Sequence, residues 1–183
     1  EKTKRFLKSL NLLDPIKFDL EEIGKPLPFK WGKCKLATVS FGHGISTTPL
    51  QIATAYAIIS NGGYKIKPTL LKKEKKFKKN KILDENVSNN INSILRKIVS
   101  TKEGTANLAN VDGYQVGGKT GTAQKIENGT YTNKKINTFV SIFPTNKPKY
   151  VLLVLLDEPK TNSEYIYNYR DGSGIKYKGT PFN

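Results

Sequence analysis

One short stretch of the chain, residues 117–124, combines a cation, two hydroxyls and three glycines in the order Gly-Gly-Lys-Thr-Gly-Thr-Ala-Gln. Its surroundings are typical of a β-strand, and glycine inside a strand marks close approach of a ligand or another backbone. Alternation along a strand puts Thr120 and Thr122 on one face and Lys119 on the other. Both hydroxyls can donate to one carboxylate, the lysine arm can curl back toward it, and Gly121 leaves the backbone bare. We therefore expect this stretch to hold an anionic, peptide-like group, with a backbone N–H available for an oxyanion hole.

The charge balance of the chain is strongly basic, with a formal net charge of +16 over 183 residues. Such a charge favours nucleic acid or a membrane surface as partner. Almost all of it is lysine, however, with arginine only at Arg5, Arg96 and Arg170, and nucleic-acid readers favour arginine for bidentate and stacking contacts. The preferred interpretation is a solvated basic surface with no nucleic-acid partner. A lysine-rich nucleic-acid-binding domain remains the alternative from another functional class.

Cysteine and histidine each occur once, as Cys34 and His43. A single cysteine forms no internal disulfide, and the pair is too small a set for a structural zinc site. We expect no metal and no cofactor. Because His43 lies in a glycine-flanked turn, it is interpreted as a turn or packing residue, and hydrolase chemistry would need a different base.

Apolar periodicity and turn residues predict an α+β fold, with an antiparallel meander toward the C-terminus packed against helices. In the second helix, Thr48, Pro49 and Gln51 form a capping box with proline at the first position. The unbroken apolar character of the last predicted strand suits a central strand. Helices are predicted at 2–13, 49–60 and from Asp84 to Gly104, loops at 14–35 and 72–81, a turn at 127–129, and strands at 64–71, 114–126, 137–143 and 149–157.

Several of these residues match a known family. Residues 119–121 form a Lys-Thr-Gly box on a predicted strand, and 40–53 read Ser-Phe-Gly-His-Gly-Ile-Ser-Thr-Thr-Pro-Leu-Gln-Ile-Ala. With Asn-Gly-Gly at 61–63, Lys-Pro at 67–68 and Asp-Glu-Pro-Lys at 157–160, the stretch 36–160 resembles class B penicillin-binding proteins. Among these it is most similar to the cell-division (septal) peptidoglycan transpeptidase. The resemblance implies a partial penicillin-binding, β-lactamase-like transpeptidase fold. The family's fold is a five-stranded antiparallel sheet flanked by helices, and three or more of the strands are expected in this chain.

The resemblance also implies a chemistry, acyl transfer from the D-Ala-D-Ala end of a peptidoglycan stem peptide to a serine and then to an amine. β-Lactams mimic the dipeptide and trap the acyl-enzyme. By the same resemblance, Lys119, Thr120, Gly121 and Thr122 bind the substrate, with Thr120 and Thr122 on the terminal carboxylate. The backbone N–H of Thr122 joins the oxyanion hole.

The remaining family boxes have only weak matches. Ser173 and Lys176 fit Ser-x-x-Lys by letters but follow the Lys-Thr-Gly box, and Ser88 with Asn90 fits Ser-x-Asn within a predicted helix. Capping and solvation are the favoured interpretation of Ser88. We expect the nucleophile to be absent, so that residues 1–183 are the C-terminal part of one transpeptidase domain, truncated at the N-terminus and at the C-terminus, and inactive alone.

Further expectations follow from the resemblance. The parent protein is expected in the bacterial inner membrane with this domain facing the periplasm, in a division complex, whereas the fragment itself is expected to be soluble. An elongation-type transpeptidase and a β-lactam sensor domain are the alternatives. A partial sheet would expose apolar surface and unpaired edges, which favours self-association of the fragment.

Overall fold

The computed structural model describes residues 1–28, 31–32, 35–72, 80–160, 167–170 and 176–179, the last two ranges as backbone. Four α-helices and one 3-10 helix precede the strands along these residues, in keeping with the predicted α+β class. The helices are α1 (Lys2–Ser9), α2 (Lys35–Ser40), α3 (Pro49–Ser60), α4 (Glu85–Ser100) and η1 (Asn107–Ala109). The strands are β1 (Gly117–Glu127), β2 (Thr130–Phe143), β3 (Tyr150–Asp157), β4 (Tyr167–Arg170) and β5 (Lys176–Gly179).

Helix α3 forms where the capping residues predict it. The Gln51 amide N–H donates to Thr48 Oγ1 over 3.2 Å, and the Thr48 N–H donates to Gln51 Oε1 over 2.8 Å. The Gln51 side chain is fully buried, and its Nε2 donates to the carbonyl oxygens of Asn11 and Asp14, each over 2.9 Å. One side chain therefore caps α3 and also joins it to the chain that leaves α1. Beside this joint, Leu10 packs against α3 in the buried core.

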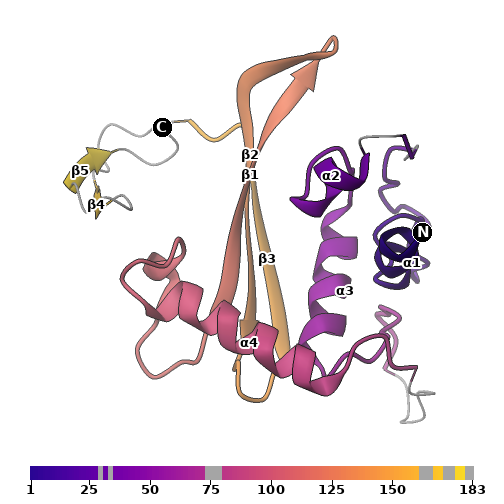
Figure 1. Cartoon of the computed structure of the whole chain (residues 1–183), viewed down its shortest axis with the longest axis horizontal. Coiled ribbons are helices and arrows are strands. Elements are labelled where there is room, and N and C mark those ends of the chain that lie inside the picture. Colours follow the sequence, from indigo (N-terminus) through magenta and orange to yellow (C-terminus); the bar gives the residue numbers. More distant parts are fainter. Residues whose placement is uncertain (29–30, 33–34, 73–79, 161–166, 171–175, 180–183) are drawn as a thin grey trace.

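Helix α4 covers the start of the sheet. It packs on β1, while α3 packs on β2 and β3, and Figure 1 shows α3 running alongside the strands and α4 crossing them near one end. A Cβ at Gly117 would lie 2.9 Å from the backbone nitrogen of Arg96, so glycine lets α4 approach closely. Val140 and Ile142 are buried on the helix-covered face of β2.

Strands β1, β2 and β3 form the predicted antiparallel meander in that order. Asn128 and Gly129 link β1 to β2 with φ of 50° and 78°, the left-handed pair that a two-residue hairpin needs. The turn prediction is confirmed. β2 begins at Thr130, earlier than the predicted 137, so the hairpin is longer than its apolar part. Strands β4 and β5 pair separately as a two-stranded ribbon.

Some predicted elements are wrong. α1 ends at Ser9, because Asn11 takes a left-handed φ of 62°, and α2 begins at Lys35 just where a loop was expected to end. The strand predicted at 64–71 is reduced to one bridge between Tyr64 and Lys81, since Pro68 cannot donate to a ladder.

Other differences concern the ends and neighbours of elements. Asp84 occupies the N-cap of α4, but its side chain makes no capping hydrogen bond, and α4 ends at Ser100. Gly104 therefore lies beyond the helix. β3 is an edge strand in the described sheet and not the predicted central strand, because it pairs only with β2. Most of the predicted loop at 72–81 lies outside the described residues.

Candidate functional site: an exposed edge strand

The Lys-Thr-Gly stretch lies on β1, which pairs with β2 along one side and, in the part of the chain that the structure describes, has a free edge on the other. Lys119, Gly121 and Thr122 are exposed and Thr120 is partly buried. Thr120 pairs with Phe139, whereas Lys119 pairs with the helix-facing Val140. The threonines therefore stand on the sheet face opposite α4, and an extended ligand has access to the strand.

The Lys119 side chain folds back along its own strand. Its Nζ donates to the carbonyl oxygen of Thr120 over 2.7 Å. This is the curled conformation that the sequence allowed, and it holds the positive charge against the backbone of Thr120.

Close packing within the fold explains why glycine occupies positions 118 and 121. A Cβ at Gly118 would lie 2.7 Å from Phe139 ring atoms and from the Val140 carbonyl oxygen, and a Cβ at Gly121 would lie 2.6 Å from Thr138 Oγ1. Real Cβ atoms do not approach other atoms so closely. Packing against β2 thus favours glycine at both positions, most strictly at Gly118, where a backbone oxygen is among the close atoms.

A threonine that the sequence reasoning missed stands beside the stretch. The Thr120 hydroxyl donates to Thr105 Oγ1 over 3.3 Å, across 15 positions of the chain. Thr105 follows Gly104 in the connection between α4 and η1. No periodicity marks it, because a connecting loop has none, and only the fold brings the two hydroxyls together.

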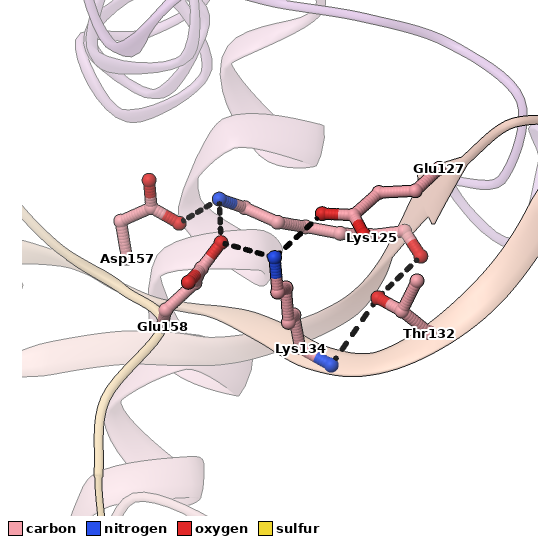
Figure 2. Close-up of polar contacts among 6 residues, drawn as sticks. All are labelled: Lys125, Glu127, Thr132, Lys134, Asp157 and Glu158. Carbon is pink, nitrogen blue, oxygen red and sulfur yellow. Dashed lines mark hydrogen bonds and ion pairs between the residues drawn. The ribbon is translucent and has the colours of Figure 1, made fainter.

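A charge cluster fastens the far end of β1 to β2 and β3 (Figure 2). Lys125 Nζ lies 2.7 Å from Asp157 Oδ1 and 2.7 Å from Glu158 Oε1. Lys134 Nζ lies 2.7 Å from Glu127 Oε1 and 3.9 Å from Glu158 Oε1. Asp157 and Glu158 belong to the segment that resembles the family, so that segment has a structural role in joining three strands.

The pKa values of this cluster shift as ion pairing requires. Hydrogen bonds to Asp157 and then Glu158 raise the pKa of Lys125, and the hydrogen bond to Glu127 raises the pKa of Lys134. The hydrogen bond from Lys125 lowers the pKa of Glu158. Lys134 and Glu158 are exposed and Lys125 is partly buried, so we assign the cluster a local role in holding the hairpin and no large share of the stability.

The hairpin end also contacts the segment after α2. His43 stands between Gly42 and Gly44, which take φ of 83° and 75°, and its ring stacks on Phe41. His43 Nε2 contacts the Tyr131 hydroxyl. The turn and packing role predicted for His43 agrees with these contacts. A cavity of about 440 Å³, lined partly by His43 and Tyr131, opens between the two segments.

The two serine patterns have different outcomes. Ser88 is fully buried, accepts from the Gly62 N–H over 3.0 Å and donates to the Ile59 carbonyl oxygen. It ties α4 to the end of α3, so the solvated role favoured for it is wrong, and the buried hydroxyl gives no support to the weak Ser-x-Asn match. Ser173 lies outside the described residues.

None of the helices in the described residues combines the length and the apolar character needed to span a bilayer. Within the same residues, no group of three or more histidine, cysteine, aspartate or glutamate side chains is placed to hold a metal ion.

Residues 1–173 match the family described as the penicillin binding protein transpeptidase domain. The chain belongs to this family. It is 34% identical over 175 residues to a probable peptidoglycan D,D-transpeptidase FtsI of Caulobacter vibrioides, a match that covers 89% of the chain and 30% of the relative. The chain thus spans about a third of that relative's length.

Solved structures of the family have the same fold. The transpeptidase domain of Burkholderia pseudomallei penicillin-binding protein 3 aligns with a TM-score of 0.80 at 27% identity, covering 86% of the chain and 49% of the solved chain. Penicillin-binding protein 3 of Mycobacterium tuberculosis, complexed with ampicillin, aligns with a TM-score of 0.78 at 27% identity, covering 88% and 40%. The predicted penicillin-binding fold is confirmed.

Proposed function

We propose that this chain, residues 1–183, is the C-terminal part of one peptidoglycan D,D-transpeptidase domain and supplies its carboxylate-binding strand. The observation that carries the proposal is the exposed edge strand β1 with Lys119, Thr120 and Thr122 at its middle. The ligand is a stem peptide ending in D-Ala-D-Ala, added as a strand along the free edge of β1. β-Lactams compete for the same place, as the ampicillin complex of the Mycobacterium tuberculosis relative suggests.

Each residue of the stretch has a proposed role. Thr120 and Thr122 donate their hydroxyls to the terminal carboxylate, and the Lys119 ammonium adds its charge from beside Thr120. Gly121 keeps the backbone accessible to the peptide. The backbone N–H of Thr122 donates to the oxygen of the scissile carbonyl, where negative charge develops during acyl transfer.

The acyl-transfer step needs a serine nucleophile. Its Oγ would attack the carbonyl carbon between the two D-alanines and form an ester bond, the C–N bond to the last D-alanine would break, and that residue would leave as free D-alanine with the serine proton on its nitrogen. Ser88 is enclosed between α3 and α4 and has no access to such a carbonyl. We propose that this chain alone forms no acyl-enzyme and cross-links nothing.

Two measurements test the proposal. Incubation with a fluorescent penicillin, followed by denaturing gel analysis, should leave the chain unlabelled, and stable labelling would contradict the absence of a nucleophile. Separately, NMR titration with an acetylated D-Ala-D-Ala peptide should shift β1 resonances more at equal concentration than its C-terminal amide does. Lys119→Ala should remove that preference and Lys149→Ala, a lysine beyond the site, should keep it. Equal binding of acid and amide would refute the carboxylate role.

The setting of the parent protein is part of the proposal. We place the parent in the bacterial inner membrane with this domain in the periplasm, acting in a division complex. The similarity to the relative named FtsI supports division over the elongation and sensor alternatives.

A further inference from the structure

The Thr105 hydroxyl is the one polar group that the connection after α4 brings to the Lys-Thr-Gly stretch in the described structure, at 3.3 Å from Thr120 Oγ1. Thr105 and Thr120 are 15 positions apart in the chain. Their contact therefore depends on how the connection between α4 and η1 is held in place. The two hydroxyls lie at the surface, Thr105 exposed and Thr120 partly buried, within reach of a ligand on β1.

The connection is anchored tightly to α4. The Ala106 N–H donates to the Ile98 carbonyl oxygen over 3.3 Å, and the Ala106 side chain is buried. A Cβ at Gly104 would lie 2.0 Å from the same carbonyl oxygen, so only glycine lets the chain turn back over the end of the helix. Thr105, between these two contacts, has little freedom to move away from β1.

The chemistry of paired hydroxyls determines which of the two, Thr105 or Thr120, donates the hydrogen bond. Without ligand, Thr120 donates its proton to Thr105 Oγ1. A carboxylate only accepts hydrogen bonds, so Thr120 must turn its proton to the ligand when one binds. The Thr120 oxygen then becomes an acceptor, and Thr105 can donate to it, which makes a chain of two hydrogen bonds that strengthen one another.

We infer that Thr105 is a positioning residue, which holds the Thr120 side chain in the rotamer that faces the ligand and donates to it when a carboxylate binds. The inference rests on the proposed function, because it takes the carboxylate as the ligand of Thr120. Thr105 itself touches no substrate and acts through Thr120.

The first test needs no ligand. Thr105→Val keeps the branched shape and removes the hydroxyl, whereas Thr105→Ser keeps the hydroxyl. Three-bond couplings report the Thr120 χ1 rotamer, which should be a single state in the unsubstituted chain and in Thr105→Ser and become averaged in Thr105→Val. Thr101→Val is the matched control, because the Thr101 hydroxyl bonds to Lys97 within α4. An unchanged Thr120 rotamer in Thr105→Val would overturn the inference.

The second test uses the acetylated D-Ala-D-Ala peptide and its C-terminal amide as probes. Loss of one net hydrogen bond should weaken binding of the acid to Thr105→Val by about 3- to 10-fold. Binding of the acid to Thr105→Ser and Thr101→Val should stay within about twofold, as should binding of the amide to all variants. An unweakened acid complex of Thr105→Val would overturn the inference. If the unsubstituted chain binds acid and amide equally, the proposed function fails, and the rotamer measurement still decides whether Thr105 positions Thr120.

Discussion

The Gln51 side chain links α3 to the chain that leaves α1, and its removal gives a quantitative prediction. Gln51→Leu keeps a side chain of similar volume but removes both donors to Asn11 and Asp14 and the acceptor for the Thr48 N–H. The second capping bond, from the Gln51 N–H to Thr48 Oγ1, remains. The substitution therefore isolates three side-chain hydrogen bonds at a fully buried position.

Each of these hydrogen bonds contributes about 0.5–1.5 kcal/mol net, and partly buried carbonyl groups left without a donor bring the total toward the upper part of that range. Three bonds give about 2–4 kcal/mol, and burial of the leucine offsets about 1 kcal/mol. We expect Gln51→Leu to lower the free energy of unfolding by about 1–3 kcal/mol, or Tm by about 2–12 °C for a chain of this size.

Urea and thermal unfolding, followed by far-ultraviolet circular dichroism, measure this loss. Gln124→Leu is the matched control, because Gln124 is exposed on β1 and its replacement should change stability by no more than about 0.5 kcal/mol. If Gln51→Leu unfolds at the same urea concentration as this control, the reasoning that the buried amide fastens α1 to α3 is refuted.

Two further predictions concern the sheet. The pKa of Glu158 is lowered and that of Lys125 is raised, so the cluster stabilises the hairpin end above the unfolded carboxylate pKa and below the unfolded lysine pKa. Protection of the β2 amides from hydrogen exchange should stay nearly constant between the unfolded carboxylate pKa and the unfolded lysine pKa, and should fall as the pH drops through the lowered Glu158 pKa. Lys125→Met should remove this pH dependence. An identical pH profile in the variant would count against the role of the cluster. The outer edge of β3 should pair with a second copy in an antiparallel register centred on Leu153, because that edge has no partner strand in the described residues and β3 carries exposed apolar side chains such as Leu152 and Val154. Sedimentation should show a dimer that added salt strengthens by screening the net charge and that Leu153→Lys abolishes, whereas a monomer at every concentration and salt would refute this pairing.

The sequence was sufficient to predict an element where the contacts that form it lie within a few neighbouring residues. The capping box of α3 and the Asn128–Gly129 turn are fixed by hydrogen bonds and φ angles within a few positions. The early part of β2 was missed because residues 130–136 extend past the helices and carry polar side chains on both faces. The apolar run of β3 predicted a central strand, but strand order depends on partners that the run itself does not specify.

The residues of the candidate site also fall into two groups, those that the local sequence predicts and those that only the fold brings together. The types and spacing at 117–124 were enough to find the strand and to place Thr120 and Thr122 on one face. Thr105 was not predictable, since its relation to Thr120 depends on a loop that returns over α4 through Gly104. The joining role of Ser88 was hidden for a similar reason, because its partners Ile59 and Gly62 lie on another helix end.

The crowding around the three glycines of β1 has a consequence for alignment. If β1 slid by one residue along β2 in one direction, Lys119 and Thr122 would occupy the places now held by Gly118 and Gly121. Sliding the other way would put Val116 and Thr120 into the places of Gly117 and Gly121. Either slip forces side chains into space that lies less than 3 Å from neighbouring atoms. The positions of the glycines thus fix the pairing register of β1 with β2, which keeps the Thr120 and Thr122 hydroxyls on the same face of the sheet.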